Sequence, residues 1–182
     1  MCSSDLWEQV CTLYGRWEPH EYAELLSQLG YYFNDALIIV ERNNHGHSVL
    51  NSLLNSFEYP KMDGCHGVYF HSEYDGKQSK SNKNKKPGYP TNVKTKALAL
   101  NTLLELISDL SMKVNSKRTL TQLKNYSKLP GNKFGASVGH DDAVISCALC
   151  AVVLSDPQIT KRINRQGRVK KTITVSNQGH FL

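Results

Sequence analysis

The chain has 182 residues, enough for one domain with a substantial core, because a chain of this length buries roughly 70% of its unfolded surface. No run of residues approaches the roughly 20 apolar positions of a membrane span, and the amino terminus lacks the layout of a secretion signal, so we expect a soluble, intracellular protein. The formal net charge of +6 favours a polyanionic partner.

The first part of the chain alternates between predicted strands and helices. Residues 9–14 predict a short strand, and Pro19 opens a helix that runs to about Leu29. Residues 36–44 read ALIIVERNN, a run of five apolar residues that closes on Glu41, which is typical of a buried strand with a charge at its carboxyl end. A turn and a helix follow, and residues 67–70 predict another short strand.

The second part continues this alternation. After a polar stretch at residues 71–89, which predicts a hairpin or loop, residues 91–109 have helical spacing and residues 118–126 predict a shorter helix. Residues 139–149 read GHDDAVISCAL and begin a helix that is apolar nearly all round, hence buried, with Asp141 and Asp142 at its amino end. Strands that alternate with helices predict an α/β fold with a sheet between helices.

Five cysteines are odd in number and follow no pattern, so we do not expect a disulfide framework. Cys147 and Cys150 have the CxxC spacing of some metal and redox sites, but no second pair of ligands accompanies them. They fall inside the predicted buried helix. We therefore interpret both thiols as part of the core.

Two basic clusters stand out among polar residues. The first cluster lies in the predicted loop, and the second follows the predicted buried helix. Each can be read either as a solvated surface segment or as a set of contacts to phosphate groups. We consider them candidate DNA-binding residues: Lys77, Lys80, Lys83, Lys85 and Lys86 in the loop, and Lys161, Arg162, Arg165, Arg168, Lys170 and Lys171 after the helix.

Three blocks together carry a resemblance to a known family. In order and approximate spacing, ALIIVERNNHG (36–46), GYPTNVKTKALALNTLLELI (88–107) and GHDDAVISCAL (139–149) resemble the nuclease domain of tailed-phage terminase large subunits. The resemblance runs from about Gln9 to Leu154. It implies a ribonuclease H-like fold, in which a mixed sheet flanked by helices holds two Mg²⁺ or Mn²⁺ ions between carboxylates.

The resemblance also implies roles for particular residues. Glu41, Asp141 and Asp142 would be the catalytic, metal-binding carboxylates, with Asp141 the more direct ligand of the late pair. Considered alone, a Glu at a strand end beside an Arg is often a solvated pair, and an Asp before a helix is often a cap. In two-metal hydrolysis one cation activates water and the other stabilises the leaving oxygen, and a shared carboxylate normally bridges them, a role that the resemblance gives to the family's first-strand Asp.

The sequence departs from the family at its beginning. The family's first metal-binding Asp lies on a strand ahead of residues 9–14, and here the only Asp before Trp7 is Asp5. No GxxxxGK[ST] motif occurs, so these residues are not the family's packaging ATPase. We interpret residues 1–156 as a nuclease domain without its first strand and residues 157–182 as a basic carboxyl-terminal tail.

The sequence thus predicts a fragment that, when complete, cleaves double-stranded phage DNA during genome packaging in the cytoplasm of a bacterial host. Its partners would be double-stranded DNA, other terminase subunits, the portal, or an upstream polypeptide that supplies the missing strand. Two alternatives remain open: a noncatalytic DNA-binding or assembly module, and an inactive prophage remnant.

Overall fold

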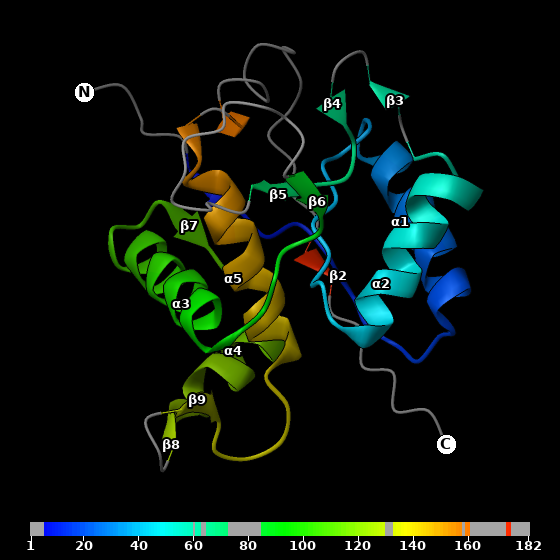
Figure 1. Ribbon diagram of the computed structural model, residues 1–182. Helices are drawn as coiled ribbons and strands as arrows, with labels where there is room; N and C mark the ends of the chain where they lie inside the picture. Colours follow the sequence, from blue (N-terminus) through cyan, green and yellow to red (C-terminus); the bar gives the residue numbers. More distant parts are fainter. Residues whose placement is uncertain are drawn as a thin grey trace, which may run out of the picture. The chain divides into compact units, whose positions relative to one another are not determined.

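The computed structural model describes residues 6–59, 61–62, 65–72, 85–129, 133–157, 159–160 and 174–175, which belong to two units (Figure 1). The inserted unit is Trp17–Thr91, and the terminal unit combines Met1–Arg16 with Asn92–Leu182. Both units contain helices and short strands, so the predicted α/β class is confirmed. The strands of the described residues pair two by two, instead of forming the one sheet that we expected.

Helices of the inserted unit pack against one another. Helix α1 (Pro19–Tyr32) starts with a proline after the N-cap residue Glu18, and the Glu21 carboxylate accepts the Glu18 backbone N–H at 3.2 Å as part of a capping box. Helix α2 (Asn44–Asn51) continues into a π-helical turn, η1 (Ser52–Ser56), and both contact α1. Their buried side chains include Tyr22, Leu26, Val49, Leu50 and Leu53.

The strands of the inserted unit are short. Strand β3 (Lys61–Met62) pairs antiparallel with β4 (Cys65–His66), and β5 (Phe70–Ser72) pairs antiparallel with β6 (Lys85–Pro87). The expected strand at residues 36–41 is extended but makes only single parallel bridges, from Ile38 to Val68 and from Glu41 to Tyr89. The first half of this segment pairs with Val68 and the second half with Tyr89, because the chain that follows Val68 continues into β5, which pairs with β6.

Three helices build the terminal unit. Helix α3 (Val93–Ser108) packs against α5 (Asp142–Leu154), and α4 (Lys117–Lys124) contacts α5 as well. Helix α5 is buried on nearly every side, as its apolar sequence predicted, and the side chains of Cys147 and Cys150 are both buried. Core packing of these thiols is thereby confirmed. The core cluster comprises Trp7, Ala99, Leu100, Leu103, Met112, Val144, Cys147, Ala148, Ala151 and Leu154.

Strands of the terminal unit join distant parts of the chain. Strand β1 (Trp7–Glu8) pairs parallel with β7 (Met112–Lys113), and β2 (Thr12–Leu13) pairs parallel with β10 (Thr174–Val175), which lies within the predicted tail. Strand β8 (Tyr126–Leu129) forms an antiparallel hairpin with β9 (Lys133–Ala136).

Gln9, between β1 and β2, is a buried polar centre of this unit. Its Nε2 donates to Thr119 Oγ1 at 3.2 Å and to Thr12 Oγ1 at 3.3 Å, and its Oε1 accepts from the Ser116 N–H at 3.0 Å. These hydrogen bonds connect the segment between the amino-terminal strands to the first turn of α4. In the described part of the chain, no helix is long and apolar enough to cross a membrane.

Candidate functional site

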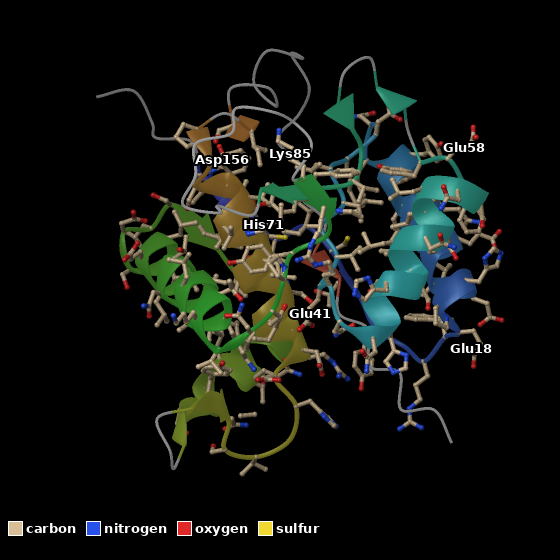
Figure 2. The ribbon with its side chains drawn as sticks, in the orientation of Figure 1. Glu18, Glu41, Glu58, His71, Lys85 and Asp156 are labelled. Atoms are coloured by element: carbon tan, nitrogen blue, oxygen red, sulfur yellow. The ribbon has the colours of Figure 1, made fainter. Side chains whose placement is uncertain are left out.

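Glu41 stands where the extended segment of the inserted unit meets α2, as Figure 2 shows. The backbone on both sides of it is held by Tyr89: the Tyr89 N–H donates to the Val40 carbonyl at 2.8 Å, and the Arg42 N–H donates to the Tyr89 carbonyl at 2.7 Å. The Glu41 side chain is half-buried. A carboxylate is thus fixed at the carboxyl end of a buried segment.

Two glycines pack tightly on the backbone around Glu41. Asn43 caps α2 by accepting the Gly46 N–H at 2.8 Å, and a Cβ on Gly46 would collide with the Glu41 carbonyl oxygen. Gly88 has a φ of +77°, which disfavours other residues, and a Cβ there would lie 2.9 Å from the Val40 carbonyl oxygen. The local backbone position of Glu41 is therefore closely determined.

An aromatic cluster borders the same segment. The ring of His71, labelled in Figure 2, meets the buried Tyr89 ring edge to face at 5.2 Å, and its Nδ1 lies 3.2 Å from Tyr69 Oη. Burial raises the pKa of Tyr89. Sequence reasoning missed this cluster, because His71 is the first residue of a polar stretch and no spacing links it to Tyr89.

Asp141 and Asp142 lie at the start of α5, Asp141 as the capping position and Asp142 as the first helical residue. The backbone carbonyl of Asp141 accepts the Ile145 N–H at 2.9 Å. Its carboxylate Oδ2 lies 3.0 Å from the ammonium of Lys96 on α3. Asp141 therefore already has a cationic partner, which sequence reasoning did not identify although Lys96 belongs to the second block of the family resemblance.

Two residues of the α4 region complete the surroundings of the α5 start. The Gln122 Oε1 accepts the Ala143 N–H at 2.8 Å and so caps the first turn of α5. The Tyr126 hydroxyl is buried, and no described residue lies within hydrogen-bond distance of it. Burial and the negative charge of Asp141 raise the pKa of Tyr126 to about 12. The folded state therefore favours the neutral form of the phenol beside Asp141.

The structure brings Asp141 and Asp142 together, whereas Glu41 belongs to the inserted unit, so its convergence with them stays a prediction. Among the described residues, no three His, Cys, Asp or Glu side chains gather closely enough to hold a metal ion. Hard cations take six or more oxygen ligands. Two adjacent aspartates, one of them paired with Lys96, do not by themselves fit a two-metal site, which requires further carboxylates.

Of the predicted DNA-binding residues, Lys85 and Lys86 are exposed on β6, and Figure 2 shows Lys85. The remaining candidates and Asp5 lie outside the described residues: Lys77, Lys80, Lys83, Lys161, Arg162, Arg165, Arg168, Lys170 and Lys171.

No protein-family model matches this chain, and no curated protein matches it.

Proposed function

We propose that this chain forms part of a metal-dependent DNA endonuclease domain of the kind found in tailed-phage terminase large subunits. Glu41, Asp141 and Asp142 are the carboxylates that hold Mg²⁺ or Mn²⁺ in this proposal. The observation that carries it is the placement of Asp141 and Asp142 at the first turn of the buried helix α5. Neither acid is part of a surface charge pattern along that helix, since the following residues are almost all apolar.

The backbone around each acid supports this assignment. Metal ligands work best when the elements that carry them are rigid. Asp141 begins a helix whose body is core, and Glu41 is held between the hydrogen bonds of Val40 and Arg42 to Tyr89.

The reaction in this proposal is hydrolysis of a phosphodiester bond in double-stranded phage DNA, in the cytoplasm of a bacterial host, together with other terminase subunits and the portal. A two-metal reaction needs more carboxylate ligands than these three residues, and Asp5 is the further candidate in this sequence.

Titration of Mn²⁺ into the purified chain, followed by calorimetry, tests whether Glu41 and Asp141 both contribute to cation binding. Glu41→Gln and Asp141→Asn should each weaken Mn²⁺ binding at least tenfold, because each removes one charged oxygen ligand. Glu105→Gln, which removes an exposed carboxylate of α3, is the matched control and should bind like the wild type. Equal binding by all four proteins, or no Mn²⁺ binding by the wild type, would overturn the site.

A second candidate is a noncatalytic DNA-binding module. The ion pair between Lys96 and Asp141 favours it, because the ammonium occupies an oxygen that a metal would need. This module would shift duplex DNA in a gel, in a salt-dependent manner, without nicking plasmid in Mg²⁺ or Mn²⁺. Nicking that disappears in Glu41→Gln excludes it.

A further inference from the structure

Residues 111–140 of the terminal unit contain no Asp or Glu. The whole chain has 22 Lys and Arg against 16 Asp and Glu, and six of the cations fall in this segment, which leaves 16 of each sign elsewhere. This segment of 30 residues therefore has a formal charge of +6. The six cations are Lys113, Lys117, Arg118, Lys124, Lys128 and Lys133.

Helix α4 presents part of this charge on its outer face. Lys117, Thr121 and Lys124 recur at helical spacing on one side and are exposed, whereas Thr119 is buried and Leu123 packs against the core. Lys117 and Lys124 are seven residues apart, which corresponds to roughly 10 Å along the helix. The helix is thus amphipathic, with a cationic outer stripe.

Two lysines of the terminal unit form ion pairs with acids, whereas the two lysines on the outer stripe of α4 do not. Lys96 pairs with Asp141 at 3.0 Å, and Lys113 pairs with Glu8 at 3.1 Å. Within the part of the chain that the structure describes, Lys117 and Lys124 have no ion-pair partner. Their charges are available to an external anion.

Arg118 is held in place by an aromatic ring. Its guanidinium carbon lies 3.5 Å from the centroid of the Tyr14 ring, a cation–π contact that uses the face of the guanidinium group. The N–H donors lie in the plane of that group, so stacking leaves them able to bind an oxygen anion bidentately. The contact orients this donor set before any ligand binds.

This charged segment lies beside the start of α5. Gln122 on α4 caps Ala143, and the Ser137 N–H after β9 donates to the Asn125 carbonyl at 2.8 Å, which closes the β8–β9 hairpin against the end of α4. Figure 1 shows α4, β8 and β9 grouped at the end of α5 where the helix begins. Asp141 and Asp142 therefore border the cationic segment.

We propose that the outer face of α4, together with the stacked Arg118, forms a cationic platform that binds the phosphate backbone of double-helical DNA next to the start of α5. Duplex DNA carries one charge per about 1.7 Å of its axis, so the outer stripe of α4 faces several phosphates at once. Such contacts do not depend on sequence. The platform rests on the proposed function in one respect, that the start of α5 is the reactive position.

The test is binding of a fluorescent duplex in EDTA at several salt concentrations. Lys117→Gln/Lys124→Gln should reduce the slope of log affinity against log salt by about 1.8, since each phosphate contact contributes about 0.9. Arg16→Gln/Lys94→Gln is the matched control, because both of its cations are exposed and lie outside the platform. It removes the same net charge and should change the slope by less than half as much.

Equal changes of slope in both double variants would overturn the platform, and so would a wild-type chain without salt-dependent duplex binding. Neither result would affect Mn²⁺ binding through Glu41 and Asp141. The two experiments therefore test the DNA-binding platform and the proposed metal site independently. Polyglutamate serves as a competitor. If it displaces the duplex equally well per charge, the surface accepts any acidic polymer and the assignment to DNA is wrong.

Discussion

The Lys96 ammonium lies 3.0 Å from the Asp141 carboxylate and joins α3 to the start of α5. An ammonium and a metal ion compete for the same carboxylate oxygen. Lys96 is thus an internal counter-ion of the acid that we propose as a metal ligand, and a cation that binds Asp141 must displace it or share the carboxylate with it.

Replacing Lys96 by Gln should strengthen Mn²⁺ binding several-fold, because the competing positive charge is removed. The free energy of unfolding should change by less than about 1 kcal/mol, since the paired side chains of Lys96 and Asp141 are 31% and 25% exposed and exposed pairs contribute little. Calorimetric titration and urea unfolding measure the two effects. Lys94→Gln, two residues earlier and exposed, is the control. Weaker Mn²⁺ binding in Lys96→Gln would contradict competition.

Plasmid cleavage by this chain should be very weak in Mg²⁺ and detectable at most in Mn²⁺, because no three potential metal ligands gather among the described residues and Asp141 is paired with Lys96. Glu41→Ala should abolish the remaining nicking, and Glu105→Ala should leave it unchanged. Agarose gels of supercoiled plasmid measure both. Robust cleavage in Mg²⁺ would show that another carboxylate, Asp5 first, completes the site.

Tyr126 should make stability depend on pH in the alkaline range. Its pKa is raised from 10.0 to about 12 in the folded protein, so the folded state favours the neutral phenol. The resulting stabilisation is complete below the unfolded pKa and is lost as the pH rises through the folded pKa, from about 10 to about 12. Urea unfolding of wild type and Tyr126→Phe at increasing pH measures it, and only the difference between them counts, because other buried tyrosines titrate too. A constant difference would contradict the prediction.

Gln9→Ala should destabilise the terminal unit by about 1–3 kcal/mol, because the Ser116 N–H and the Thr119 hydroxyl lose a buried partner. Gln28→Ala is the control, since Gln28 is exposed and bonds only to the Glu24 side chain within its own helix. Thermal unfolding compares the two variants. A loss in Gln9→Ala no larger than in Gln28→Ala would show that the network around Gln9 contributes little.

The helices could be predicted from the sequence almost residue by residue. The predicted helix at 91–109 is Val93–Ser108, and the helix that opens at Pro19 runs to Tyr32. Their signals are local: apolar spacing, a proline at the first turn of α1, and Asn92, whose side chain accepts the N–H groups of Lys94 and Thr95.

The pairing of the strands and the partners of the site residues could not be predicted in this way. Strand β1 has two residues, too few for a periodic pattern, and it exists because Trp7 pairs with Met112 more than a hundred positions later. The same is true of the contact between Lys96 and Asp141, which depends on the packing of α3 against α5. Sequence patterns could assign the acids to a helix or a strand, but they could not identify the residues that contact those acids from distant parts of the chain.

The division of the chain has a consequence for synthesis. The terminal unit needs both Trp7 and Met112 for one of its ladders, and Thr12 and Thr174 for another, whereas the inserted unit consists of one continuous stretch. During translation, all of Trp17–Thr91 is therefore synthesised before the strand pairs of the terminal unit can form. Early folding of that stretch would shorten the effective loop between β2 and α3 and lower the entropy cost of closing it.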